Sequence, residues 1–291
     1  MLHDDSARAR RDGIALITLT TLCFATLDAS AKWLVGSLPV IEVVWLRFLT
    51  HVLITSALLA PVYGRELVTV RRPRLQLLRA AMLGSMTGLN FWALQYLQLA
   101  ETGAIQFSVP LLIAVISAVW LGERLDTRRW LAIAVGFAGV LLVIRPGGHG
   151  FHPALLLSVM NAGLYAAFNL LTRRMAATES AASMQLMSAL GAAVLLAPFA
   201  IARWQWPGGW QAWLAIALTG LCGGLGHYFM AKAHRHASAA VLGPFLYQQI
   251  VYMTLAGWLL FGQVPDALVV AGTTVVVGSG LYLLWLEMKA G

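Results

Sequence analysis

Long apolar segments follow one another almost without interruption along this 291-residue chain. A helix needs about 20 apolar residues to cross a hydrocarbon core that is roughly 30 Å thick. Segments of that length recur from the first residues to the last. They predict an all-α membrane protein with ten spans, at residues 13–34, 40–63, 75–97, 102–121, 128–145, 153–173, 182–203, 210–232, 238–261 and 266–287.

Composition supports this prediction. Hydrophobic residues make up 59% of the chain and charged residues 11%, whereas about a quarter of the residues of a soluble domain are charged. The connections between the predicted spans are too short for a folded domain outside the membrane. We therefore expect the protein to act within the bilayer.

The basic residues predict the orientation. If the N-terminus is cytoplasmic, every Lys and Arg except Lys32, Arg47, Arg145 and Arg203 falls at the inner side, as the positive-inside rule requires. Both ends are then cytoplasmic, in a bacterial-type plasma (inner) membrane, and the net charge of +8 implies no nucleic-acid partner. The alternative is a signal peptide cleaved near Ala29-Ser30-Ala31, which would delete the first polar row described next.

Two rows of polar and aromatic residues, 141 positions apart, indicate a duplication. The rows are Thr20, Phe24, Asp28, Lys32 and Asn161, Tyr165, Asn169, Arg173. Residues four apart share one face of a helix, so each row forms a polar ridge. Leu121-Gly122-Glu123 likewise recurs as Phe261-Gly262-Gln263, and Asn90-Phe91 as His227-Tyr228.

Each half then holds five spans, an odd number, so the second half enters the membrane from the opposite side. Inverted repeats around a midplane site are typical of secondary transporters. We divide the chain into a tail, a first repeat, a linker, a second repeat and a tail, at residues 1–12, 13–145, 146–152, 153–287 and 288–291.

The chain also resembles the drug/metabolite transporter superfamily with its EamA-type repeat. The resemblance rests on Ala100, Pro110, Leu121-Gly122-Glu123-Arg124-Leu125 and Gly136-Phe137-Ala138-Gly139-Val140. The second copy is weaker, with Ile250 in place of Pro110 and Gln263 in place of Glu123. The resemblance implies a central cavity lined mainly by spans 1, 3, 4, 6, 8 and 9, and a branch that includes amino-acid exporters of the YddG type.

Polar and aromatic residues inside the spans are the candidates for cargo binding. A carboxylate such as Asp28 costs roughly 2.5 to 3.5 kcal/mol at the centre of a lipid-facing helix, so it should face the interior. Aromatic rings with polar edges suit an amphipathic molecule. The candidate residues are Phe24, Asp28, Asn90, Trp92, Tyr96, Gln106, Asn161, Tyr165, Asn169, His227, Gln248 and Tyr252.

Each candidate also has a structural interpretation. Asp28 is either a cation anchor or proton carrier, or a partner of a basic or amide group such as Lys32. His227 titrates near neutral pH or makes an interhelical hydrogen bond. Arg47 and His51, one turn apart, either recognise an anion or pair with Glu42 or Glu101.

Glycines and a proline predict local features of the helices. Gly84/Gly88 and Gly220/Gly224 have the spacing of close helix contacts. Pro110 predicts a kink in the span at 102–121.

We predict a secondary transporter or exporter of small organic metabolites that works by alternating access, with aromatic or other zwitterionic amino acids as the favoured cargo. The sequence leaves the direction of transport and the oligomeric state open, and a monomer is compatible with it. The main alternative is efflux of cationic drugs attracted by Asp28. A membrane-embedded enzyme or a non-transporting lipid-binding protein is disfavoured, because nucleophiles and bases are not clustered and the polar rows predict a wet interior. The sequence predicts no cofactor, metal or nucleotide site, and its partners are a small molecule and the lipid bilayer.

Overall fold

The computed structural model describes residues 7–120, 125–147 and 151–290. These residues contain helices and no strand. The α-helices are α1 (Ala7–Leu34), α2 (Val40–Tyr63), α3 (Pro73–Tyr96), α4 (Leu99–Gln106), α5 (Val109–Trp120), α6 (Thr127–Ile144), α7 (Ala154–Met175), α8 (Ala181–Ala202), α9 (Gly209–His236), α10 (Ala239–Leu246), α11 (Gln248–Phe261) and α12 (Ala267–Ala290), with a short 3₁₀ helix η1 (Gly64–Val68) after α2.

Eight helical segments of the described chain are long and apolar enough to cross a membrane. They are α1, α2 with η1, the α4–α5 stretch, α6, α7, α8, α9 and α12. The predicted spans at 75–97 and 238–261 are not among them. Helix α3 carries Gln76 and Arg79 inside its length, which lowers its hydropathy, and α10 and α11 are separate helices of 8 and 14 residues.

The predicted spans at 102–121 and 238–261 are each broken into two helices. The first breaks at Phe107, before Pro110, so the sequence misplaced the irregularity by about one turn; Pro110 instead lies in the first turn of α5, where its missing N–H costs least. The second breaks at Tyr247. The rings of Phe107 and Tyr247 lie 5.1 Å apart, so the two breaks meet inside the molecule.

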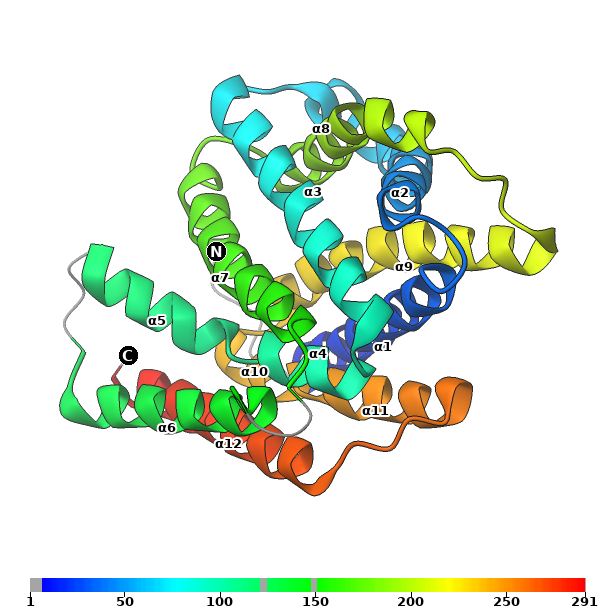
Figure 1. Cartoon of the computed structure of the whole chain (residues 1–291). Coiled ribbons are helices and arrows are strands. Elements are labelled where there is room, and N and C mark those ends of the chain that lie inside the picture. Colours follow the sequence, from blue (N-terminus) through cyan, green and yellow to red (C-terminus); the bar gives the residue numbers. More distant parts are fainter. Residues whose placement is uncertain (1–6, 121–124, 148–150, 291) are drawn as a thin grey trace.

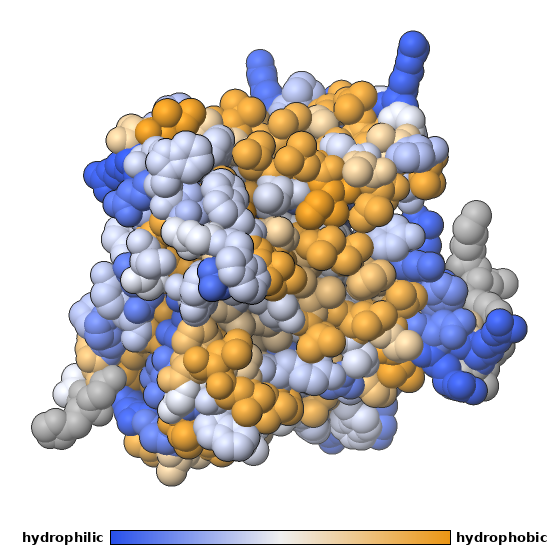
Figure 2. Space-filling model, turned by 90° about the vertical axis from the view of Figure 1, so that its right-hand side faces the viewer, coloured by the Kyte–Doolittle hydropathy of each residue, from blue (hydrophilic) through white to orange (hydrophobic). Residues whose placement is uncertain are grey.

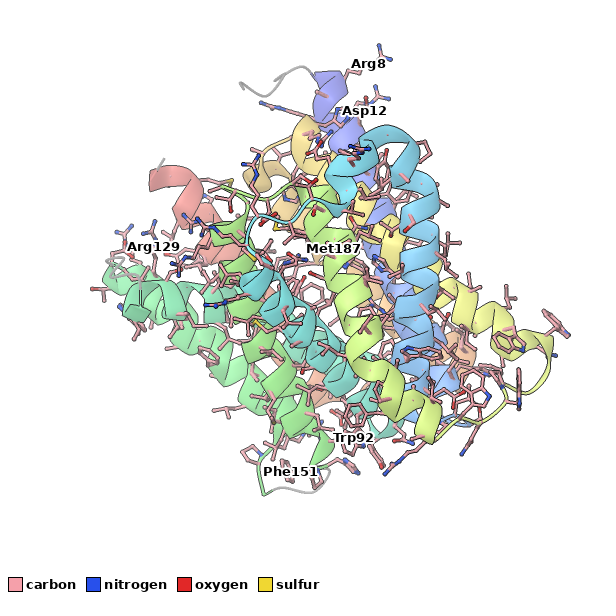
Figure 3. All side chains as sticks on the ribbon, turned by 90° about the horizontal axis from the view of Figure 1, so that it is seen from above. Arg8, Asp12, Trp92, Arg129, Phe151 and Met187 are labelled. Carbon is pink, nitrogen blue, oxygen red and sulfur yellow. The ribbon has the colours of Figure 1, made fainter. Side chains whose placement is uncertain are left out.

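The helices of the two halves pack in corresponding pairs (Figure 1). Helix α2 packs on its counterpart α8, and α6 on α12, while α1 packs on α9 as α7 packs on α3. Arg8 and Phe151, close to the starts of α1 and α7, lie at opposite ends of the molecule in Figure 3. The halves therefore run in opposite directions and interlock. The repeated Leu121-Gly122-Glu123 segment and Arg124 lie outside the described residues.

Close backbone approach joins α6 to α12. A Cβ atom built at Gly139 would lie 2.8 Å from the carbonyl oxygen of Gly272, and one built at Gly272 would lie 2.6 Å from that of Gly139. Small residues permit such contacts between helices in lipid. The pair packs at one edge of the molecule, away from α2 and α8 (Figure 1).

Large apolar side chains cover much of the outer surface. Leu53, Val62 and Leu259 are examples, each more than 60% exposed. In Figure 2 apolar residues dominate the face that is shown, and hydrophilic residues gather toward its margins. This pattern is what a bilayer demands of a surface that it surrounds.

Candidate functional site

The carboxylate of Asp28 is buried between α1 and α3. Asn90 donates a hydrogen bond from Nδ2 to Asp28 Oδ1 at 2.9 Å. Lys32, the neighbour that the sequence offered as a structural partner, instead donates from Nζ to the carbonyl oxygens of Leu94 and Leu97 at 2.8 and 2.6 Å. Lys32 thus caps the C-terminal end of α3, and Asp28 takes its partner from another helix.

Aromatic rings continue this site toward α9. The rings of Phe24 and His227 make an edge contact with centroids 5.1 Å apart. The ring of His51, from α2, lies 6.1 Å from that of His227. Gly226 allows this approach, because a Cβ atom there would lie 2.6 Å from the Phe24 ring.

The polar row of the second half makes an amide contact between α7 and α4, a helix of the first half. Asn161 donates from Nδ2 to Gln106 Oε1 at 2.9 Å. Asn169 donates to the Tyr165 carbonyl oxygen of its own helix at 2.8 Å. Each half therefore joins its first helix to a neighbour through an amide hydrogen bond.

Several of these polar side chains remain half-buried. Asn90, Tyr165, Asn169 and His227 lie inside their helices, and Gln106 ends α4 at the break in that span. A polar group exposed to lipid at that depth would be costly. Partial exposure at these positions is typical of side chains that face water within the protein.

Two predicted aromatic residues lie apart from this group. Trp92 and Tyr96 are 53% and 55% exposed, and Tyr96 stacks on His152 with ring centroids 5.1 Å apart. Trp92 is two residues from Asn90, and two residues rotate a helix by about 200°, so the two side chains leave α3 on nearly opposite faces. Figure 3 shows Trp92 at the same end of the molecule as Phe151.

Gln248 and Tyr252 pair with each other on α11. Tyr252 donates from its hydroxyl to Gln248 Oε1 at 3.3 Å. Tyr252 also lines a groove of about 470 Å³ between α1, α9 and α11, together with Trp33 and Phe261. A second pocket, of about 280 Å³, lies between α5, α6, α7 and α12 and includes Ser117 and Arg129.

Neither pocket contains Asp28, Asn90 or His227. The central cavity that the sequence predicted therefore stays a prediction. Among the described residues there is also no group of three or more His, Cys, Asp or Glu side chains that can hold a metal ion.

A buried polar face on α2 is the feature that sequence reasoning resolved least well. Arg47, His51 and Thr55 are 5%, 2% and 2% exposed. Nε and Nη1 of Arg47, both ring nitrogens of His51 and the hydroxyl of Thr55 are buried without a hydrogen-bond partner. Each such group costs about 1–3 kcal/mol, and a charged one costs more.

The structural interpretation of Arg47, pairing with Glu42 or Glu101, is not what the structure shows. Glu42 accepts a hydrogen bond from the Gln205 backbone N–H at 2.9 Å, and Glu101 accepts one from the Gln98 N–H at 2.8 Å. Both carboxylates are thus engaged at the ends of their own helices. The four-residue spacing of Arg47 and His51 continues to Thr55, which is the signal that was available in the sequence.

Comparison with known proteins places these features in context. Residues 11–145 and residues 152–286 each match the EamA-like transporter family. The S-adenosylmethionine uptake transporter of Rickettsia felis is 26% identical over 292 residues, covering 99% of this chain and 97% of that protein. The riboflavin transporter of Vibrio cholerae is 28% identical and covers 94% of each chain.

Two further proteins extend the comparison. The pseudopaline exporter CntI of Pseudomonas aeruginosa is 27% identical, covering 92% of this chain and 94% of the exporter. A crystal structure at 23% identity aligns with 98% of this chain and 99% of its own, with a TM-score of 0.65. This last likeness concerns the fold alone.

Proposed function

Since this chain belongs to the EamA-like transporter family of membrane transporters for small metabolites, we propose that its own cargo is a zwitterionic metabolite, with aromatic amino acids as the first candidates. The observation that carries the proposal is the group of half-buried amide, aromatic and imidazole side chains beside a buried carboxylate. Such a group offers hydrogen bonds and ring surface to a small amphipathic molecule.

The chemistry of the group favours a zwitterion over other cargo. Asp28 offers a negative charge to an ammonium, and the Phe24 and Tyr165 rings offer surface to an apolar side chain. A phosphorylated cargo calls for several convergent cations, whereas Arg79 already donates to Thr172 and Ser188 and stacks on Phe168 at 4.4 Å. Efflux of cationic drugs is the second candidate, favoured by Asp28.

The named relatives carry different molecules, and one is an uptake transporter whereas another is an exporter. Family membership therefore does not identify the cargo of this chain, which has to be inferred from its own site residues. We infer cytoplasmic termini from the distribution of basic residues, and export from the resemblance to amino-acid exporters.

The mechanism that we propose is alternating access. The two halves rock against each other and expose the site first to one side of the membrane and then to the other. Asp28 and His227 are the side chains that we expect to carry a proton if transport is coupled to a gradient.

Transport into proteoliposomes tests the proposal. Purified protein is supplied with a mixed pool of labelled amino acids, nucleosides and organic cations, with and without a proton gradient. We expect aromatic amino acids to move, and Asp28→Asn or His227→Gln to remove any dependence on the gradient. Movement of organic cations alone would select the drug-efflux alternative, and movement of no labelled compound would contradict both.

A further inference from the structure

The buried polar face of α2 lies against a glycine-rich face of α9. A Cβ atom at Gly223 would lie 3.3 Å from His51 Nδ1 and 3.4 Å from Arg47 Nη2. One at Gly224 would lie 3.3 Å from the Thr55 hydroxyl. Because these α9 residues have no side chains, the α9 backbone packs closely against the polar atoms of α2 and offers them no side-chain hydrogen-bond partner.

The two buried arginines among the described residues differ in their environments. Arg79, on α3, donates to the Met184 carbonyl oxygen and to the hydroxyls of Thr172 and Ser188. Arg47 lies over the ring of its neighbour Phe48 at 4.4 Å. That contact covers one flat face of the guanidinium and leaves the in-plane N–H groups of Nε and Nη1 without acceptors.

The chemistry of this set fits a planar anion. A guanidinium cannot lose its proton in a protein and presents its N–H groups in a fork that matches a carboxylate. An imidazole and a hydroxyl on the same helical face supply further donors at one-turn intervals. Arg47 forms no ion pair within 4.0 Å with an acid of the described chain. Asp28, the buried acid with which it interacts electrostatically, is instead hydrogen-bonded to Asn90.

The face adjoins the site described above. His51 lies beside His227, whose ring contacts Phe24, and Asp28 follows Phe24 by one turn of α1. A positive group on α2 and a negative group on α1 thus flank the same aromatic residues. This arrangement has the polarity that the two ends of an amino acid require.

We propose that Arg47, His51 and Thr55 form the site that receives the carboxylate of the cargo, an assignment that rests on the transport function proposed above. In the present conformation α9 closes over the site. Cargo reaches it when α9 moves away from α2, and the carboxylate then accepts the unpaired N–H groups of Arg47. Binding satisfies donors that the unloaded protein leaves unpaired, so the site favours a carboxylate over its neutral isostere.

A pair of isosteric probes tests this site. Thermal unfolding of the purified full-length protein is measured in detergent against increasing L-phenylalanine and against L-phenylalaninamide, which differs by an amide in place of the carboxylate. We expect the acid to bind about tenfold to hundredfold more tightly than the amide, the range for a hydrogen bond to a charged group. Arg47→Gln should abolish that preference.

The control is Arg74→Gln, which removes an equal charge from an exposed position at the start of α3. This variant should keep the preference for the acid. The unliganded Arg47→Gln protein should be at least as stable as the wild type, because it loses an unpaired buried charge. If Arg47→Gln does not fold, the preference for the acid over the amide is compared between the wild type and His51→Asn, in which it should fall.

Equal binding of acid and amide by the wild type, or a preference that survives in Arg47→Gln, would overturn the proposal. A large loss of unliganded stability in Arg47→Gln alone would also overturn it by assigning Arg47 a structural role. The transport assay distinguishes failure of the carboxylate-site proposal from failure of the proposed transport function. If phenylalanine is transported but both probes bind equally, only the assignment of the carboxylate site is overturned. If the acid binds preferentially but is not transported, only the proposed transport of amino acids is overturned.

Discussion

Single residues at the helix ends link the two halves just beyond the membrane-length segments Thr127–Ile144 and Ala267–Leu286. Asp266 precedes α12 and accepts hydrogen bonds from the backbone N–H groups of Leu268 and Val269, at 3.0 Å each. It also forms an ion pair with Arg145, which ends α6 in the left-handed conformation with φ 48°. The hydrogen bond from Arg145, followed by that from the Val269 N–H, lowers the pKa of the Asp266 carboxyl below its ordinary value.

A lowered pKa in the folded state gives this pair a defined pH dependence. Its contribution is fully present above the pKa of an unfolded aspartate, about 3.9, and is lost as the pH falls through the folded value. We expect Asp266→Asn to cost up to about 1 kcal/mol at pH 7 through loss of the exposed ion pair, since asparagine caps a helix as well as aspartate does.

Thermal unfolding of wild type and Asp266→Asn, from pH 7 down to pH 3, measures this effect. The difference between the two proteins should shrink as the pH falls below about 4. Arg145→Gln removes the same pair from the other side and should show the same trend. A difference that stays constant with pH would contradict the assignment.

At the scale of helices, glycines decide how closely α2 and α9 approach. The spacing of Gly220 and Gly224 predicted a close helix contact, and a Cβ atom at Gly220 would lie 1.9 Å from the Thr50 hydroxyl and 2.8 Å from the His51 backbone nitrogen. The corresponding pair in α3 is less restrictive. Gly84 has ordinary contacts with Ala192, and Gly88 has open space.

Gly220→Ala should therefore separate α2 from α9. We expect it to lower the free energy of unfolding by about 1–3 kcal/mol, the usual cost of overpacking. Gly163→Ala, in α7, is the matched control because a Cβ atom there meets nothing within 4 Å. The control should gain up to about 1 kcal/mol from the better helix propensity of alanine. Equal melting temperatures for the two variants would show that the contact does not limit packing.

At the scale of the whole molecule, the breaks in the two discontinuous helices link the halves. Phe107 belongs to the first half and Tyr247 to the second, and their rings are in contact. A Cβ atom at Gly280 would collide with the Tyr247 hydroxyl at 1.9 Å, so α12 also packs closely against the break at Tyr247. In the alternating-access mechanism proposed above, relative motion of the halves must change these contacts.

Cross-linking across this contact should stop transport. Cysteines replace Phe107 and Tyr247, the native Cys23 and Cys222 become alanine, and a short bifunctional thiol reagent joins the pair. We expect transport to fall in proportion to the cross-linked fraction and to return when a cleavable linker is reduced. Each single-cysteine variant treated with the same reagent is the control. Full transport by the cross-linked protein would exclude rocking at this interface.

The sequence by itself determined that the chain is a helical membrane protein built from two related halves. These properties depend on the length of apolar segments and on spacing along one helix, which are local. It also identified Asp28, Asn90, Phe24 and His227 as candidates, because polar residues inside apolar helices are costly wherever they lie.

Only the tertiary structure decided which candidates meet. It assigned Asp28 to Asn90 and Lys32 to the end of α3, turned Trp92 away from Asn90, and divided two predicted spans at Phe107 and Tyr247. It also left Nε and Nη1 of Arg47 without a hydrogen-bond partner. The physical reason is that a side chain finds its partner on a neighbouring helix, and packing between residues far apart in the chain determines which helix that is.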